Sequence, residues 1–341
     1  MHANSFDFIR FLAAGAVIIG HHTALNGGKE PPLPLVMDTL PSLAVCVFFS
    51  LSGYLIFNSL KRDSSPSVFF AARLARIMPN LLFSLIIVSL AMMLWFNNYA
   101  NLEAHLRYVW HNLWMFKHGV LYQIPGVLEG RPLPGPNGSL WTLPYEFWMY
   151  VALFSVFLFS AGLRSVILIS FFLFCSFHWI SAHPGSIIKF FTITFKTVAF
   201  GKLGTYFFAG ALVAAFWNVI ESRKWQLSFA LLVLALTFSA LVGPRNPFLA
   251  SAIALLSILV GLGSWGAWFN RGGDPSYGMY IFGFPIAQLA LLAYRDFYGS
   301  LIITLVMSIA IGYSTYWVFE QRCMAARGSL AALLRWPFRS V

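Results

Sequence analysis

Charge is the property that this sequence lacks most. Charged residues make up 10% of its 341 residues, whereas hydrophobic residues make up 59%. A soluble domain carries about 25% charged residues, so this composition excludes a soluble globular protein and indicates an integral membrane protein. Acidic residues are the scarcer kind, with 11 Asp and Glu against 22 Lys and Arg. The basic residues gather near the ends of apolar runs, so the net charge of +11 does not predict nucleic-acid binding.

Potential metal ligands are also sparse. The three cysteines, Cys46, Cys175 and Cys323, have neither the spacing of a zinc site nor that of a redox motif. Three histidines between residues 97 and 140 are six and seven residues apart, which does not match the pair of a helical zinc site. We therefore expect no metal site.

Apolar sequence is abundant instead. Runs near the roughly 20 residues that span a bilayer recur along the whole chain. About ten of them are predicted to be transmembrane helices: 6–25, 41–60, 77–96, 141–160, 164–181, 203–219, 226–242, 247–265, 276–294 and 299–318. The expected fold is therefore all-α, a polytopic membrane helical bundle. We assign residues 1–322 to one transmembrane domain and residues 323–341 to a basic cytoplasmic tail.

The distribution of Lys and Arg predicts the orientation in the membrane. Short connections with dense basic residues, such as Lys61 and Arg62, alternate with longer ones in which basic residues are dilute. Cytoplasmic segments carry such an excess of Lys and Arg. We therefore expect both termini to be cytoplasmic and the 97–140 connection to face outward. A bacterial cytoplasmic (inner) membrane, with its lipids as partners, is the expected location.

The first predicted helix carries three ionisable residues inside an apolar run, namely Asp7, Arg10 and His21. Such groups are costly within a membrane and usually face a bundle interior or a wet cavity. Arg10 and His21 are 11 residues apart, close to three turns at about 3.6 residues per turn, so they share one face of the helix. Asp7 lies three residues before Arg10, a spacing at which opposite charges on a helix can pair.

Two further arginines, Arg73 and Arg76, are three residues apart and point the same way on a helix. An arginine fork donates two parallel hydrogen bonds to phosphate oxygens, so this pair suits a phosphate-bearing ligand. An ordinary positive-inside anchor or a contact with lipid headgroups explains the pair equally well.

A carboxylate, Glu146, lies at the start of another apolar run, just after Pro144. A proline and an acidic residue are both at home in the first turn of a helix. That preference explains the residue type but not its position at the mouth of a membrane span. Glu146 is therefore a candidate for a polar cavity wall, as is the small pair Ser52 and Gly53, although helix packing explains small residues as well.

The longest connection, residues 97–140, contains Trp110 and Trp114 and then a Gly/Pro-rich stretch from Pro125 to Gly138. An interfacial helix is the ordinary explanation for such tryptophans. Long connections without evident structure are also often functional, so a surface that binds an acceptor is an alternative.

These stretches resemble, in order, the motifs of the acyltransferase-3 family of integral membrane O-acyltransferases, and the resemblance spans nearly the whole chain. The matching residues are Asp7, Arg10 and His21; Phe48 to Tyr54; Arg73, Arg76 and Pro79; Trp141, Thr142, Leu143 and Glu146; and Ser276 to Tyr280. Many members also have a His shortly after the last motif, where this chain reads Phe282, Gly283, Phe284 and Pro285. Such a His therefore cannot be required here in the same form.

The resemblance implies transfer of an acyl group, usually acetyl from acetyl-CoA, to a hydroxyl of a glycan or lipid-linked saccharide, as in polysaccharide modification. The candidate catalytic residues are His21, Glu146 and Asp7; the candidate donor-binding residues are Arg10, Arg73 and Arg76; the candidate cavity-wall residues are Ser52, Tyr54, Trp141 and Tyr277. His21 would act as the general base on the hydroxyl or as a nucleophile that carries the acyl group. Some members have a fused extracytoplasmic hydrolase-like domain, which residues 1–341 do not contain, so transfer is expected to finish within the membrane domain.

A multi-pass transporter or flippase is the alternative function, because charges within a membrane also mark transport pathways. Transporters are often built from internal repeats, however, and the two halves of this chain show no correspondence. A membrane scaffold without chemistry would leave the charges of the first helix without a reason. The sequence therefore favours an acyltransferase.

Overall fold

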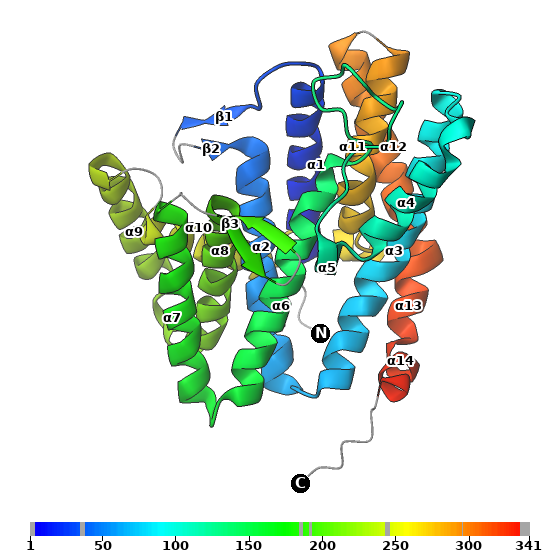
Figure 1. The fold of residues 1–341 in the computed structure, drawn as a ribbon. Coiled ribbons are helices and arrows are strands. Elements are labelled where there is room, and N and C mark those ends of the chain that lie inside the picture. Colours follow the sequence, from blue (N-terminus) through cyan, green and yellow to red (C-terminus); the bar gives the residue numbers. More distant parts are fainter. Residues whose placement is uncertain are drawn as a thin grey trace. The chain divides into compact units, whose positions relative to one another are not determined.

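The computed structural model describes residues 4–34, 38–183, 187–190, 193–242, 246–294 and 296–334. Within them the fold is almost entirely helical (Figure 1). The longer helices are α1 Phe6–Leu25, α2 Leu40–Arg62, α3 Pro66–Trp95, α4 Leu102–Leu113, α6 Thr142–Phe159, α7 Leu163–Ala182, α8 Thr197–Ala215, α9 Trp217–Val242, α10 Pro247–Leu262, α11 Ser276–Ala293 and α12 Phe297–Thr315. The shorter ones include α5 Met115–His118, α13 Gln321–Ala325 and α14 Arg327–Leu333, and a π-helical turn, η5 Tyr316–Glu320, joins α12 to α13.

Two small antiparallel hairpins are the β-structure of the described residues. Strand β1 Pro32–Leu33 pairs with β2 Asp38–Thr39, and β3 Ile187–Phe190 pairs with β4 Ile193–Lys196. The prediction of an all-α membrane bundle is therefore confirmed. The last part of the predicted basic tail, residues 335–341, lies outside the described residues.

Eight helical segments are long and apolar enough to cross a membrane, among the residues that were described: 6–25, 40–62, 66–95, 138–159, 163–182, 197–215, 276–293 and 297–325. Each matches a predicted span. The other two predicted spans are also helical, since 226–242 lies within α9 and 247–265 contains α10. Helix α10 has 16 residues and so measures about 24 Å, shorter than the roughly 30 Å hydrocarbon core. Residues 263–265, which we predicted to extend it, lie beyond its end.

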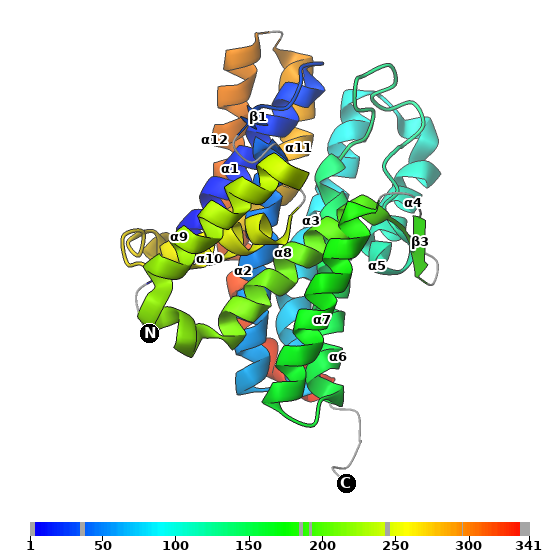
Figure 2. The same ribbon diagram turned by 90° about the vertical axis from the view of Figure 1, so that its left-hand side faces the viewer.

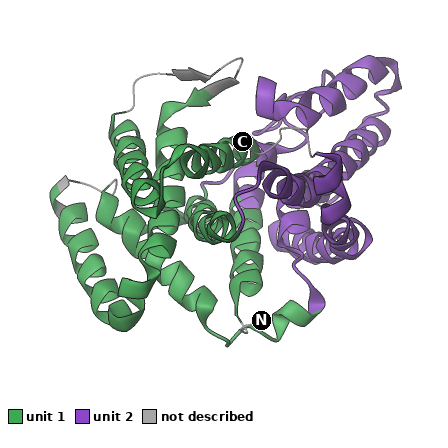
Figure 3. Cartoon of the chain, turned by 90° about the horizontal axis from the view of Figure 1, so that it is seen from below, with its two compact units in different colours: residues 1–20, 30–62, 142–271 green, residues 21–29, 63–141, 272–341 purple. Residues whose placement is uncertain are grey.

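The chain divides into two compact units, each assembled from separate segments (Figure 3). Unit 1 comprises residues 1–20, 30–62 and 142–271, and unit 2 comprises residues 21–29, 63–141 and 272–341. The single domain predicted over residues 1–322 covers all of unit 1 and the part of unit 2 up to residue 322, and unit 2 also includes the predicted tail. Helix α1 belongs to unit 1 up to Gly20 and to unit 2 from His21 onward.

Unit 1 is organised around α8, which packs against α2, α7 and α10. Figures 1 and 2 also show α6 beside α7. Helices α2 and α8 approach closely because each presents a glycine to the other's backbone. A Cβ atom on Gly53 would overlap the carbonyl oxygen of Phe207, and one on Gly210 would overlap that of Ser50. The close backbone approach expected at Gly53 is therefore confirmed.

We expect Gly53→Ala to destabilise the protein, because the added methyl has no space against α8. Overpacking of this kind typically costs about 1–3 kcal/mol. Gly15→Ala is the matched control, since a Cβ at Gly15 on α1 would meet nothing within 4 Å. Thermal unfolding of both variants in the same detergent measures the difference. Equal melting temperatures for the two variants would contradict the proposed packing.

Unit 2 has α3 as its central element. Helix α3 packs against α4, α11, α13 and α14, and α11 packs against α12. Ala331 of α14 is buried, so the described beginning of the predicted tail is part of this unit. Helix α3 runs unbroken through Pro79 and includes Arg73 and Arg76, so the predicted span 77–96 begins a full 11 residues earlier, at Pro66.

Candidate active site residues

On α1, the predicted pairing of Asp7 with Arg10 is confirmed, with Oδ1 of Asp7 3.5 Å from Nη1 of Arg10. The contact lies at the beginning of the helix, in unit 1. Both side chains are only partly exposed, at 29% for Asp7 and 17% for Arg10. An acidic group in the first turn also complements the helix dipole, so the pair keeps two charges at low cost in an apolar surrounding.

The two neighbouring histidines of α1 have different surroundings in unit 2. His22 is fully buried, its Nε2 lies 3.0 Å from Oγ of Ser300, and its ring packs edge-on against Phe297. His21 is half-buried and packs edge-on against Phe284, with ring centroids 5.3 Å apart. Among the residues that the structure describes, none hydrogen bonds to the imidazole of His21. His22 is therefore held by a hydrogen bond, whereas no hydrogen bond to the ring nitrogens of His21 is seen within the described residues.

Phe284 belongs to the stretch in which the family's further His is replaced. It packs with Leu25 and Ala287 in a small apolar cluster. The position next to His21 is thus apolar in this chain.

A second polar cluster lies in unit 1, where Glu146 of α6 meets Ser52 of α2. The hydroxyl of Ser52 donates to Oε1 of Glu146 at 3.1 Å, and the hydroxyl of Tyr150 donates to the same oxygen. Glu146 is half-buried, while Tyr150 is buried. The structure therefore brings together the predicted carboxylate and one predicted wall residue. Tyr150 was missed, although its position one turn after Glu146 on a helix was the available signal.

The two arginines of α3 have different partners. Nη2 of Arg76 lies 2.7 Å from Oδ2 of Asp274, whose side chain is only 6% exposed. The other oxygen of Asp274 accepts hydrogen bonds from the N–H and the hydroxyl of Ser276, at the beginning of α11. The guanidinium of Arg73 lies over the ring of Phe69, 5.9 Å from its centroid. Asp274 was missed as a partner because 198 residues separate it from Arg76.

A buried carboxylate, Glu320, lies next on the same side of α3. It is 1% exposed and accepts a hydrogen bond from the side-chain amide of Asn80. Asn80 follows Arg76 by four residues and Arg73 by seven, so these three side chains form one stripe along the helix. Glu320 was also missed, because it lies just beyond the predicted span 299–318, whereas the helical segment of the structure continues to Ala325. This stripe has carboxylate partners on two other segments, Asp274 just before α11 and Glu320 in the π-helical turn after α12.

The remaining predicted wall residues are divided between the two units. Tyr54 is buried in unit 1 against the rings of Phe6 and Trp217. Tyr277 donates from its hydroxyl to the carbonyl oxygen of Ile77, 3.0 Å away, and thus ties α11 to α3 within unit 2. Trp141 is half-buried at the end of the 3₁₀ turn Gly138–Trp141.

Within the described ranges, no group of three or more His, Cys, Asp or Glu side chains is arranged to hold a metal ion. The candidate residues described above include the half-buried imidazole of His21, the carboxylate of Glu146, and the guanidiniums of Arg73 and Arg76. An imidazole and guanidiniums are suited to proton transfer and to binding an anionic ligand, respectively.

Comparison with known proteins gives a family match and two similar proteins. The family profile of the acyltransferase-3 family, described as an acyltransferase domain, matches residues 3–319. The chain is similar to an O-acetyl transferase of Shigella phage Sf6, with 29% identity over 94% of this chain and 96% of the relative. It is also similar to Nodulation protein 10 of Rhizobium leguminosarum bv. viciae, with 25% identity over 97% of this chain and 96% of the relative. No solved structure matches the chain.

Proposed function

Because the chain belongs to the acyltransferase-3 family and is an integral membrane acyltransferase, we propose that it is an O-acetyltransferase that uses acetyl-CoA from the cytoplasm. The acceptor is a hydroxyl of a glycan or lipid-linked saccharide on the outer side of a bacterial cytoplasmic membrane. The name of the phage relative supports an acetyl group, since that protein is called an O-acetyl transferase. The observation that carries the proposal is the half-buried His21, whose imidazole makes no hydrogen bond within the described part of the chain.

His21 acts as the general base in this proposal. A hydroxyl is a weak nucleophile, and a positioned histidine is the group that most often takes its proton. The acceptor oxygen then forms a bond to the acetyl carbonyl carbon, and the bond between that carbon and the sulfur of CoA breaks. The proton taken by His21 passes to the departing thiolate. The products are the O-acetylated acceptor and free CoA, and the histidine is regenerated.

Arg73 and Arg76 bind the phosphates of the donor in this proposal, because both lie in the first part of α3, on the predicted cytoplasmic side. The ion pair with Asp274 fixes Arg76 without using all five N–H donors of its guanidinium. Arg10, paired with Asp7, is a third candidate for the donor's polar part. Glu146 remains a candidate catalytic carboxylate, held by Ser52 and Tyr150.

The function is tested by measuring acyl transfer directly. The purified protein is reconstituted into vesicles together with the surface glycan of a strain that lacks its gene, and labelled acetyl-CoA is supplied on one side of the membrane at a time. We expect a mass increase of one acetyl group on the glycan. Transport of unmodified glycan across the membrane, with no change in its mass, would instead support a flippase.

We expect the double variant Arg73→Ala, Arg76→Ala to bind acetyl-CoA at least tenfold more weakly than the wild type. Its insertion in the membrane should be unchanged. Lys at both positions should restore binding only in part, because an ammonium lacks the planar fork of a guanidinium. Equilibrium binding of acetyl-CoA to the protein in detergent is the measurement. The donor-site assignment is wrong if the double Ala variant binds as tightly as the wild type.

A further inference from the structure

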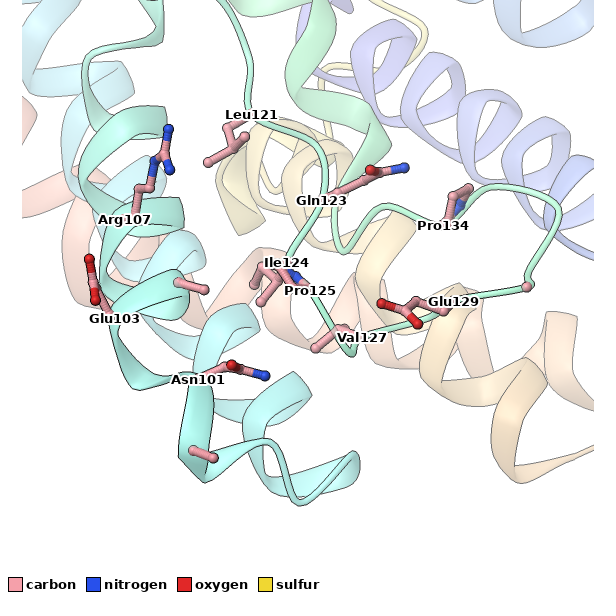
Figure 4. Close-up of a pocket in the computed structure, with 13 residues that line it drawn as sticks. Asn101, Glu103, Arg107, Leu121, Gln123, Ile124, Pro125, Val127, Glu129 and Pro134 are labelled. Atoms are coloured by element: carbon pink, nitrogen blue, oxygen red, sulfur yellow. The ribbon is translucent and has the colours of Figure 1, made fainter.

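A pocket of about 790 Å³ lies in unit 2, between α4 and the irregular chain that follows α5 (Figure 4). Its volume is within the range of about 300–1,000 Å³ that is typical of small-molecule sites. Asn101, Glu103 and Arg107 line it from the side of α4, while Gln123 and Glu129 line it from the irregular chain. None of the residues assigned above to catalysis or to the donor lines this pocket, so it is a separate site.

Side-chain amides hold the irregular wall of the pocket in place. Asn112 of α4 both donates to the carbonyl oxygen of residue 121 and accepts from its N–H, each at 2.9 Å. Asn98 donates to the carbonyl oxygen of residue 125 at 2.8 Å. Gln288 of α11 donates to the carbonyl oxygens of residues 133 and 135. These backbone groups, which belong to no helix or sheet, thus have hydrogen-bond partners, and the pocket is preorganised for a ligand.

Helix α4 is anchored just as firmly. Its inner face carries His105 and Tyr108, which are 2% and 0% exposed, and Nδ1 of His105 lies 3.0 Å from Oγ of Ser89 on α3. Burial lowers the pKa of His105, so this histidine stays neutral and the anchor carries no charge at neutral pH. The wall that bears Glu103 and Arg107 is therefore rigid.

A third face of α4 is exposed and apolar. It consists of Leu102, Leu106, Trp110 and Trp114, which recur every four residues and are all at least half exposed. Exposed leucines and tryptophans in one stripe are typical of a helix that lies in the membrane interface. Leu102 and Leu106 of this stripe directly precede the pocket residues Glu103 and Arg107 in the sequence. The pocket therefore opens beside the surface that we expect to face lipid.

The chemistry of the lining indicates the kind of ligand. Two carboxylates and one guanidinium give the pocket a net negative charge, which disfavours the phosphates of CoA or of a lipid headgroup. Carboxylates, amides and a guanidinium together supply both acceptors and donors, as a neutral ligand with many hydroxyls requires. Ile124 and Val127 are buried and offer an apolar floor for its C–H groups.

We propose that this pocket binds the saccharide of the acyl acceptor, with the acceptor's lipid lying along the apolar stripe of α4. The inference rests on the proposed function and adds to it the place where the acceptor docks. Arg107 lines the pocket from α4 and Glu129 lines it from the irregular chain (Figure 4). In this proposal the two side chains hydrogen bond to sugar hydroxyls.

The test compares Arg107→Ala and Glu129→Gln with Lys117→Ala. Lys117 is the matched control because it is an exposed cation at the end of α5 that does not line the pocket. Two probes are used: the lipid-linked glycan isolated from cells lacking the gene, and the same glycan after mild acid has removed its lipid. Binding of each is measured on the protein in nanodiscs without acetyl-CoA, and KM values for glycan and acetyl-CoA are measured separately.

We expect both pocket variants to weaken glycan binding and to raise the KM for glycan about tenfold or more. Their KM for acetyl-CoA should be unchanged. The Lys117→Ala variant should have wild-type values for both substrates. The lipid-linked probe should bind more tightly than the free glycan. Wild-type affinity for the glycan in both pocket variants would overturn the inference, and so would equal losses for glycan and acetyl-CoA. A wild-type protein that binds glycan in this pocket but transfers no acetyl group would instead disprove the proposed function alone.

Discussion

His21→Ala is expected to abolish acetyl transfer while leaving the protein folded. Loss of a general base typically lowers a rate by a factor of about 10² to 10⁴, which reads as inactivity in most assays. The ring of His21 is half-buried and packs edge-on against Phe284, and no hydrogen bond to it within the described residues would be lost. Transfer rates are to be normalised to folded protein, measured by size-exclusion chromatography in detergent.

His22→Ala is the control for this prediction. His22 is fully buried and interacts with Ser300, so its removal should lower the yield of folded protein more than the rate per folded molecule. Comparable losses of rate per folded molecule in both variants would mean that the two histidines merely line a helix interface. A fully active His21→Ala enzyme would remove the general base from the proposed reaction.

Asp274→Asn is expected to cost about 3 kcal/mol of folding free energy, the low end of the effect of breaking a buried ion pair. The low end applies because Arg76 keeps 30% of its side chain exposed, whereas Asp274 keeps 6%. The side-chain amide introduced by this substitution can still accept the hydrogen bonds from Ser276. The loss of stability therefore measures the missing charge rather than missing hydrogen bonds to Ser276. The free energy of unfolding is measured by thermal unfolding of Asp274→Asn, Arg76→Gln and the double variant. The double variant should lose less stability than the sum of the losses in the two single variants.

Asp63→Asn is the matched control, because Asp63 makes the same pair of bonds without a buried arginine. Its Oδ1 accepts from the N–H and the hydroxyl of Ser65, at an exposed site. These hydrogen bonds hold the pKa of Asp63 below its ordinary value. Its replacement should leave the melting temperature nearly unchanged. Additive losses in the Asp274 and Arg76 variants would show that the two residues stabilise the protein independently.

Local patterns predicted much of this structure. Apolar runs of sufficient length located eight candidate spans, because hydropathy and helix length are properties of contiguous sequence. The pairing of Asp7 with Arg10 was equally accessible, since a separation of three residues determines geometry on a helix. The early end of α10 at Leu262 was not predicted, because the apolar composition continues past it.

Local patterns could not predict the contacts between segments that are distant in the sequence. Asp274 and Glu320 lie 198 and 240 residues from their partners Arg76 and Asn80, and their pairing depends on how helices pack. The pocket beside α4 was not predicted either, although the long 97–140 connection was considered as a surface that binds an acceptor. Its shape follows from single amide groups, such as that of Asn112, which have no periodic signature.

Asn98, Asn112 and Gln288 hold the backbone around the pocket, yet none of them lines it. Among the lining residues, Glu129 shares this structural role, because one of its carboxylate oxygens accepts a hydrogen bond from the N–H of Gly126 at 2.7 Å. Rim positions such as Gln123 and Arg107 hold no backbone group of this wall among the described residues. Substitutions there should leave the course of the chain unchanged, so the proposed acceptor preference can diverge through a few of them. Exchanging rim residues alone between two related enzymes should exchange their preferences for the acceptor sugar.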